Sequence, residues 1–297
     1  MLEQIVIVYP WQTNSAAESK IDLPELNDIH LWQIDLTQYP LEFPNSNQVQ
    51  QLLSSKELKR CNRLVNEKLR MRFSLSHAWK RIIIARYLKS SPLELIFNTA
   101  KYGKPFLSSE TPSYIPALKF NFSHSADRLL LAISNSNEIG VDVEFMNPEI
   151  EALELAERFF ALTEFKQLKN LSDKEIIIPF YRIWTAKEAV IKALGKGLSY
   201  HLSSFGIQLT DNYIPVGFQE AGEARASSRS GAYIQYVSSE WQQQSQSLKG
   251  DGYIQCLAHL DEPNAEEWRV YNFELEDNYM GAIASPKPIK TCFIWKI

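Results

Sequence analysis

The sequence of 297 residues contains only three cysteines, at 61, 256 and 292. Their odd number and wide spacing exclude a disulfide framework or a thiolate metal site and favour a reducing compartment. There is no apolar run of about 18 residues, the length that spans a bilayer. The N-terminal residues MLEQIVIVYPWQ lack the basic and long apolar regions of a signal peptide. We therefore expect a cytoplasmic protein with no membrane partner.

An excess of positive charge is also missing. The 31 Lys and Arg residues face 35 Asp and Glu residues, and the net charge is -4. Because bulk nucleic-acid binding usually needs a basic domain, we expect no nucleic-acid partner. Basic residues do cluster between Lys56 and Arg86. Such a cluster is either an anion site or, more commonly, a solvated helix face.

Several catalytic motifs are absent. The sequence Gly195-Lys196-Gly197 lacks the following Ser or Thr and the upstream glycine of a phosphate loop. No serine lies in GxSxG, and no HExxH is present. These absences argue against nucleotide triphosphate hydrolysis, esterase chemistry and a zinc site.

What is present, at 45% hydrophobic residues, is ample material for a core. Two internal similarities predict a duplication. IDL (34–36) matches VDV (141–143), and FNFSHSADRLLLAIS (120–134) aligns without gaps with YNFELEDNYMGAIAS (271–285). The two segments of the second match lie farther apart in the sequence than those of the first. An insertion near 218–252, rich in Ser and Gln, would explain this difference. That composition suits exposed loops flanking a short strand such as YIQYV.

Each half is predicted to contain a strand, helices and a strand-turn-strand pair. The first half has strands at 5–9 and 31–36 and helical patterns over 48–65 and 68–88. The second has a strand at 140–145 and helical patterns over 150–160 and 172–194. Because strand-turn-strand pairs are antiparallel, we expect an α+β fold. Its halves, 1–139 and 140–297, would form a pseudo-twofold duplication with the active site in the cleft between them.

The stretch IGVDVEF (139–145) carries two acids on one face of its strand. Asp142 and Glu144 would lie about 6 to 7 Å apart, so that their like charges repel. Exposure at a sheet edge would relieve the repulsion, and so would a divalent cation, for which oxygen-only ligands favour Mg²⁺. In IWTAKEAVIKALGKGLS (183–199), a helix ending at Gly195 or Gly197 would place Glu188 one turn before Lys192. The two are either a surface pair or a metal ligand beside a phosphate-binding ammonium.

The polar residues belong to only one copy of the duplication. The turn Ser123-His124-Ser125 has Leu275 at the position of His124 in the second copy. In the helices, Ala78 falls near the position equivalent to Glu188. The duplicated scaffold is therefore expected to have one working site.

Five motifs in order resemble the surfactin-type 4'-phosphopantetheinyl transferases: YGKP (102–105), NFSHS (121–125), GVDVE (140–144), RFFALTE (158–164) and WTAKEAVIKALGKGL (184–198). The resemblance covers about residues 5–209 and resumes near 268–285, whereas 218–252 departs from it. It implies two α+β halves with coenzyme A bound between them. It also implies transfer of 4'-phosphopantetheine from coenzyme A to a serine of apo acyl or peptidyl carrier proteins, releasing adenosine 3',5'-bisphosphate.

The resemblance further implies the roles of individual residues. The Mg²⁺ ligands would be Asp142, Glu144 and Glu188. Contacts to coenzyme A would come from Lys59 or Arg60, with Arg72, at the 3'-phosphate, from Gly103, Lys104 and Pro105 at the adenine nucleotide, and from Ser123, His124 and Lys192 at the pyrophosphate. The base for the carrier serine would be Glu188 or Glu164, and the carrier would dock near Phe159, Phe160 and Phe165.

We expect a monomer, because the duplication already supplies both halves of the cleft. Two other functions stay open from the sequence. One is a magnesium-dependent hydrolase of coenzyme A or another pyrophosphate, and the other is a non-catalytic homologue that binds coenzyme A. The native carrier cannot be named from one sequence.

Overall fold

The computed structural model describes residues 21–39, 47–207, 233–237, 243–244, 253–256, 268–287, 289 and 291–297. Within these residues the chain forms two compact units. The first takes its described residues from 21–23, 39–98 and 107–116, and the second from 24–38, 99–106 and 117–297. These units follow contacts within the fold, whereas the halves 1–139 and 140–297 follow sequence similarity and stay a prediction. The strand expected at 5–9 lies outside the described residues.

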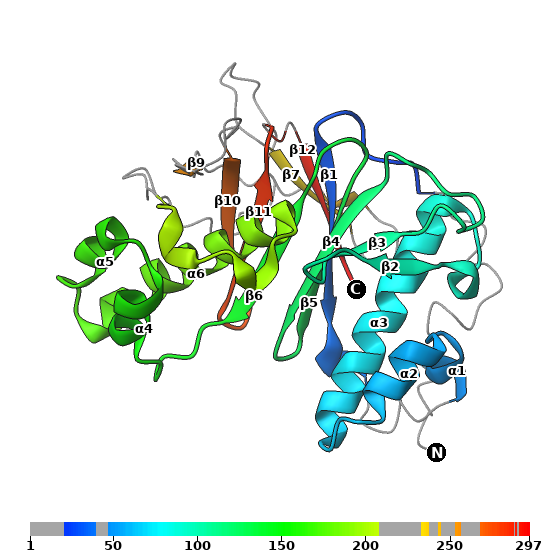
Figure 1. Ribbon diagram of the computed structural model, residues 1–297, viewed down its shortest axis with the longest axis horizontal. Helices are drawn as coiled ribbons and strands as arrows, with labels where there is room; N and C mark the ends of the chain where they lie inside the picture. Colours follow the sequence, from blue (N-terminus) through cyan, green and yellow to red (C-terminus); the bar gives the residue numbers. More distant parts are fainter. Residues whose placement is uncertain are drawn as a thin grey trace. The chain divides into compact units, whose positions relative to one another are not determined.

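The first unit is helical. It contains α1 (Asn47–Gln51), α2 (Ser55–Cys61), α3 (Glu67–Leu88) and a 3-10 turn at Pro92–Glu94 (Figure 1). The single helix expected over 48–65 is two short helices, because Ser54 caps α2. Its side chain accepts from the Glu57 backbone N–H, and the Glu57 carboxylate accepts from the Ser54 N–H. Strands β2 (Phe97–Thr99) and β3 (Pro105–Leu107) form a two-stranded sheet.

The second unit contains two larger sheets. One has the order β4-β5-β1-β12-β7-β8, formed by Lys119–Ser125, Arg128–Ser134, Asp28–Asp35, Thr291–Lys296, Tyr233–Val237 and Gln243–Gln244. The other has the order β6-β11-β10-β9, formed by Gly140–Phe145, Tyr279–Ser285, Trp268–Leu275 and Tyr253–Cys256. Strand β12 is parallel to both β1 and β7, and the remaining pairs are antiparallel. The YIQYV strand expected near the insertion is β7, and most of 218–252 lies outside the described residues.

The predicted α+β fold is confirmed, and its repeat is visible in the topology. In one sheet β1 pairs with β5 and β5 with β4, and in the other β6 pairs with β11 and β11 with β10, all antiparallel. The two hairpins differ at the turn. Ser125 faces Arg128 across two residues, whereas Leu275 faces Tyr279 across three. The gapless sequence match therefore changes register by one residue across this turn.

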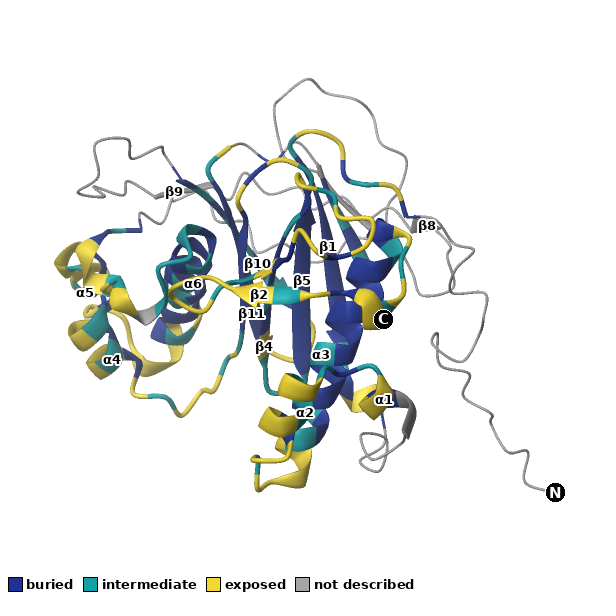
Figure 2. Cartoon of the chain, turned by 45° about the vertical axis from the view of Figure 1, so that its right-hand side comes forward, coloured by how far each residue is buried: buried dark blue, intermediate teal, exposed yellow. Residues whose placement is uncertain are grey.

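Helices cover one face of the four-stranded sheet. Helix α6 (Asp173–Leu194) packs on β6, β10 and β11, and α4 (Ala152–Phe159) and α5 (Leu162–Leu168) pack beside it. The α6 residues expected to be buried are buried: Ile183, Ala186, Val190 and Ala193. The opposite face of the sheet shares a core with the six-stranded sheet. Figure 2 shows buried strands and exposed outer faces of α4 and α5. No helix of the described part has the length and apolarity needed to cross a membrane.

Candidate active site

The candidate site lies where β4, β6 and α6 meet, within the second unit. Strands β4 and β6 lie next to each other but belong to different sheets. Hydrogen bonds from side chains of β4 connect the two strands in place of backbone pairing. Asn121 Oδ1 accepts from the Val141 N–H at 2.9 Å, and Ser123 Oγ donates to Asp142 Oδ1 at 2.8 Å. Residues two apart on a strand share a face, which explains the spacing of the NFSHS motif.

Ser125 continues this series at the end of β4. Its hydroxyl donates to Glu144 Oε2 at 2.6 Å and accepts from the Phe145 N–H at 3.1 Å. Both predicted acids of β6 are therefore held by a serine of β4. By the same alternation His124 points to the opposite face of β4, and it is exposed.

Lys192 brings a positive charge to Asp142. The Lys192 ammonium donates to Asp142 Oδ1 at 2.6 Å and to Ser123 Oγ at 2.7 Å. The Asp142 side chain is only 2% exposed. Its second oxygen, Oδ2, is buried and accepts no hydrogen bond from any described residue. An ionised oxygen in that position is costly unless a further cation or donor reaches it.

Glycine allows α6 to carry its acid to this place. A Cβ on Gly140 would lie 1.9 Å from the Ala189 carbonyl oxygen, so only glycine permits this approach of α6 to β6. Helix α6 ends at Gly195, with φ +66°, as the sequence predicts.

The acids perturb one another. Burial, and then the charge of Asp142, raise the pKa of Glu144 to about 7. Burial and Asp142 also raise the pKa of Glu188, whose carboxylate makes no hydrogen bond to a described residue. Glu188 adds to the shift at Glu144, so the three carboxylates lie within electrostatic range of one another. Sequence reasoning anticipated this repulsion.

The carboxylates fit a divalent cation by their chemistry. Carboxylate oxygens are the donor type that Mg²⁺ prefers. Glu144 and Glu188 have a raised pKa, and Asp142 has one oxygen without a hydrogen bond from a described residue. Among the described residues no group of three or more His, Cys, Asp or Glu is arranged as a ready metal centre. The Lys192 ammonium, which is bonded to Asp142, already neutralises part of the charge. The orphaned Asp142 Oδ2 and the mutual repulsion nevertheless leave room for a further positive charge.

Glu164 is placed differently from Glu188. Its side chain is 1% exposed and pairs with the Lys187 ammonium at 2.9 Å. It also accepts from the backbone N–H groups of Ala161 and Ile207. Lys187 in turn donates to the carbonyl oxygens of Leu202 and Phe205. With its oxygens occupied, Glu164 joins α5, α6 and the segment after α6.

The YGKP loop lies beside the end of α6. The Lys104 ammonium donates to the Ala193 carbonyl oxygen at 2.8 Å and to Glu138 Oε2 at 2.7 Å. A Cβ on Gly197, which has φ +54°, would come within 2.7 Å of the Tyr102 carbonyl oxygen. Two motifs that the sequence presents separately are thus one contact surface. Gly103 lies in the same loop, and Pro105 is the first residue of β3.

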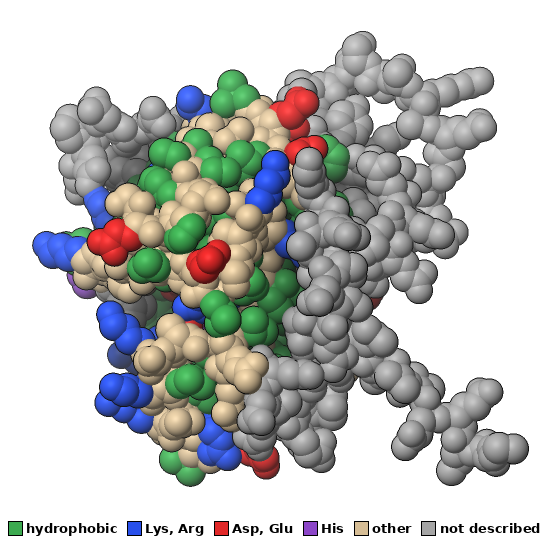
Figure 3. Space-filling model, turned by 90° about the vertical axis from the view of Figure 1, so that its right-hand side faces the viewer, with side chains coloured by type: hydrophobic (Ala, Val, Ile, Leu, Met, Phe, Trp, Pro, Cys, Tyr) green, Lys and Arg blue, Asp and Glu red, His purple; other side chains and the backbone are tan. Residues whose placement is uncertain are grey.

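The predicted 3'-phosphate residues belong to the first unit. Lys59 and Arg60 are exposed in the last turn of α2, and Arg72 is half-buried in α3. The Arg60 guanidinium lies over the ring of Phe73, 5.5 Å from its centroid. Of the two alternatives at the 3'-phosphate, Arg60 has this contact with the ring of Phe73, and Lys59 has no such contact among the described residues. Figure 3 shows Lys and Arg side chains grouped along one edge of the face that it draws.

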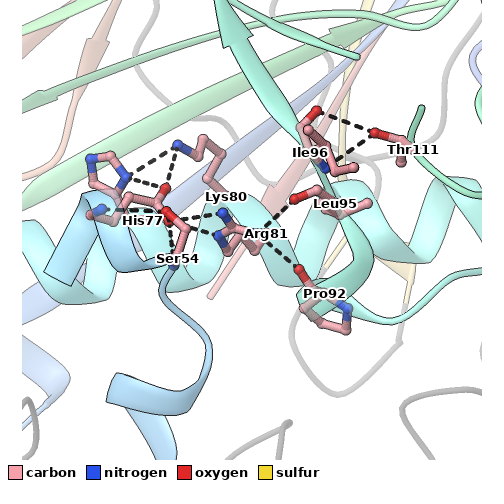
Figure 4. Close-up of polar contacts among 9 residues, drawn as sticks. Ser54, His77, Lys80, Arg81, Pro92, Leu95, Ile96 and Thr111 are labelled. Atoms are coloured by element: carbon pink, nitrogen blue, oxygen red, sulfur yellow. Dashed lines mark hydrogen bonds and ion pairs between the residues drawn. The ribbon is translucent and has the colours of Figure 1, made fainter. Parts of the chain in front are cut away.

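A buried charge cluster fixes α2 to α3. Glu57 Oε1 lies 2.8 Å from His77 Nδ1 and 3.4 Å from the Lys80 ammonium, and Glu57 Oε2 lies 2.8 Å from the Arg81 guanidinium (Figure 4). Burial alone would raise the pKa of Glu57, but His77, Lys80 and Arg81 hold it well below its usual range. Arg81 also donates to the carbonyl oxygens of residues 92 and 95. The basic residues of α2 thus lie on a helix that buried ion pairs join to α3.

Of the three aromatics near which the carrier is predicted to dock, Phe160 is buried and Phe159 and Phe165 are half-buried, and docking at this place stays a prediction. Phe160 is 4% exposed and stacks on Phe180, with ring centroids 5.3 Å apart. Phe159 and Phe165 are partly buried against the same core. Near them, Leu162 is 64% exposed and Leu153 is 42% exposed. The RFF motif supplies core residues because α4 and α5 must bury an apolar face.

Sequence reasoning missed four residues that hold the functional ones: Asn121, Ser125, Glu138 and Glu57. The alternation of polar residues on one strand face would have identified the first two. Glu57, three residues after Ser54, has the spacing of a capping box. Nothing local indicated Glu138, whose partner Lys104 is far away in sequence.

Comparison with known proteins gives consistent matches. A sequence model of the 4'-phosphopantetheinyl transferase superfamily matches residues 138–254, and one described as 4'-phosphopantetheinyl transferase, N-terminal, matches residues 43–136. The 4'-phosphopantetheinyl transferase HetI of Nostoc sp. is 37% identical over 187 residues, which are 62% of this chain and 75% of HetI. The 4'-phosphopantetheinyl transferase Sfp of Bacillus subtilis is 32% identical over 170 residues, covering 57% of this chain and 72% of Sfp.

Proposed function

The chain belongs to the 4'-phosphopantetheinyl transferases, and we propose that it moves 4'-phosphopantetheine from coenzyme A to a serine of an apo acyl or peptidyl carrier protein. The products are the holo carrier and adenosine 3',5'-bisphosphate. One observation of the structure supports this most: Asp142, Glu144 and Glu188 lie within electrostatic range of one another beside Lys192. A pyrophosphate substrate needs such a combination of cation site and ammonium.

Mg²⁺ would be held by Asp142, Glu144 and Glu188. When bound, it supplies positive charge to the pyrophosphate of coenzyme A and neutralises charge on the leaving phosphate. The orphaned Asp142 Oδ2 and the raised pKa values of the two glutamates support this assignment.

Lys192 and Ser123 bind the substrate in this proposal. The Lys192 ammonium has a third proton beyond those given to Asp142 and Ser123, and its side chain is 29% exposed. It can therefore donate to a pyrophosphate oxygen while staying fixed. The contact of His124 to the pyrophosphate rests on the family resemblance alone, because His124 points away from this group.

Glu188 is the better base of the two candidates. Burial raises the pKa of both glutamates, but the Glu188 carboxylate makes no hydrogen bond to a described residue, so its oxygens are available to accept a proton. Glu164 is engaged by Lys187 and two backbone N–H groups. The serine oxygen forms a bond to the phosphorus of the pantetheinyl phosphate, the pyrophosphate P–O bond breaks, and the serine proton passes to Glu188.

The remaining assignments belong to the same proposal. Coenzyme A would contact Gly103, Lys104 and Pro105 through its adenine nucleotide, and Arg72 with Lys59 or Arg60 through its 3'-phosphate. We propose a cytoplasmic monomer with one working site per chain. No observation favours the hydrolase or the non-catalytic alternative.

The test is intact-mass spectrometry of an apo carrier protein incubated with coenzyme A, Mg²⁺ and the protein. The expected result is a mass gain of one phosphopantetheinyl group on the carrier serine, and a Ser→Ala carrier is the control. Release of adenosine 3',5'-bisphosphate without any carrier would support the hydrolase instead. Binding of coenzyme A without either product would support the non-catalytic alternative.

A further inference from the structure

Ser125 stands at the end of β4 and makes two hydrogen bonds to β6. Its hydroxyl donates to the Glu144 carboxylate at 2.6 Å and accepts from the Phe145 N–H at 3.1 Å. The hydrogen bond from the Phe145 N–H orients the hydroxyl. Because the oxygen accepts on that side, its single proton points in another direction. The proton is thereby aimed at Glu144 Oε2.

Glu144 depends on this hydrogen bond to keep its position. Its side chain has three rotatable bonds and stands next to the end of β6, where Phe145 is 40% exposed. Asp142 and Glu188 repel its carboxylate, which would otherwise turn toward water. Asp142 is fixed by Ser123 and Lys192, whereas Ser125 makes the only hydrogen bond to the Glu144 side chain among the described residues.

We infer that Ser125 is a positioning residue, which holds Glu144 in the place where it binds the divalent cation. This inference rests on the proposed function, because it takes Glu144 as a ligand of Mg²⁺. In this inference Ser125 acts through Glu144 and not by contact with the cation or the substrate. Hydrogen bonds of this kind to a ligand typically account for about 10- to 100-fold in metal affinity.

A purely structural role is the competing explanation, because Ser125 also connects the two sheets. The two roles differ in what they move. A structural loss lowers stability and affects all properties of the site together. Loss of positioning weakens the binding of the cation, and activity is recovered when enough cation is added.

The experiment measures Mn²⁺ binding by the free-Mn²⁺ EPR signal, with coenzyme A present and no carrier. Ser125→Ala should lower the affinity for Mn²⁺ by about 10-fold or more. Its activation constant for Mg²⁺ in carrier modification should rise by a similar factor, while kcat at saturating Mg²⁺ changes little. Ser125→Thr keeps the hydroxyl and should restore Mn²⁺ binding.

Ser172 provides a matched control. Its hydroxyl donates to the Glu175 carboxylate at the same 2.6 Å, but at the start of α6. Ser172→Ala should leave the Mn²⁺ affinity unchanged. In a Glu144→Gln background, Ser125→Ala should have no further effect on Mn²⁺, because the two residues act through one bond.

The outcomes separate this inference from the proposed function. Unchanged Mn²⁺ affinity in Ser125→Ala, or an equal loss in the Glu144→Gln background, would overturn the positioning role. Absence of Mn²⁺ binding by the unmodified protein would overturn it as well. Unmodified protein that binds Mn²⁺ but never modifies a carrier would refute the proposed function, while the Mn²⁺ titrations would still decide the role of Ser125.

Discussion

Replacing Glu57 with Gln should destabilise the helix pair that carries the predicted 3'-phosphate residues. Glu57 is the only acid bonded to Lys80 and Arg81 among the described residues, and their side chains are 3% and 4% exposed. Its two oxygens accept from both cations, from His77 and from the Ser54 backbone. A carboxamide has one accepting oxygen, so it cannot serve these donors on both sides.

The magnitude follows from the burial of the cations. Breaking a buried ion pair by removing one partner costs about 3–5 kcal/mol. Lys80 limits the cost, because burial already lowers its pKa to about 8 and the ammonium can lose its proton. Arg81 cannot do so, and it keeps its bonds to two carbonyl oxygens. We therefore expect a loss of about 3 kcal/mol, the lower end of that range.

The assay is urea unfolding at pH 7 with hydrogen exchange of the α3 amides, which reports the local stability of this unit. Glu175→Gln is the control, since Glu175 has the equivalent capping-box position in the first turn of α6, but its side chain is exposed and bonds to no cation among the described residues. If Glu57→Gln loses no more stability than Glu175→Gln, the buried charges do not hold α2 to α3 and the reasoning is wrong.

Three further predictions concern activity and pH. Asp142→Ala and Glu188→Ala should each abolish carrier modification while the protein keeps a cooperative melting transition; full activity in both would contradict the metal assignment. His124→Ala should weaken coenzyme A binding in calorimetry, and an unchanged affinity would remove His124 from the site. Burial lowers the pKa of His77 from 6.5 to about 4. The unfolded chain therefore takes up this proton first, so stability should fall by about 1–3 kcal/mol as pH drops from 6.5 to 4. His77→Gln should flatten this part of the melting profile, and an identical slope would refute the shift.

Much of the fold could be predicted from local pattern. Helix α6 and strand β6 lie where their sequence patterns place them, because an apolar stripe of period 3.6 and a short, mostly apolar run can both be recognised from consecutive residues. Helix α5 was missed, since seven residues are too few for a clear period. The parallel pairing of β12 with β1 was also missed, because strands so distant in sequence leave no local mark of their partner.

The sequence by itself determined the motifs, the duplication and the identity of the acids. The tertiary structure decided which of these residues lie close together. It separated Glu188 from Glu164, which look alike in sequence, by giving one an open carboxylate and the other a buried lysine. It also brought Ser125 to Glu144 across two sheets. The physical reason is that a side chain's chemistry is fixed by its type, but its charge state and freedom depend on neighbours that only the folded chain supplies.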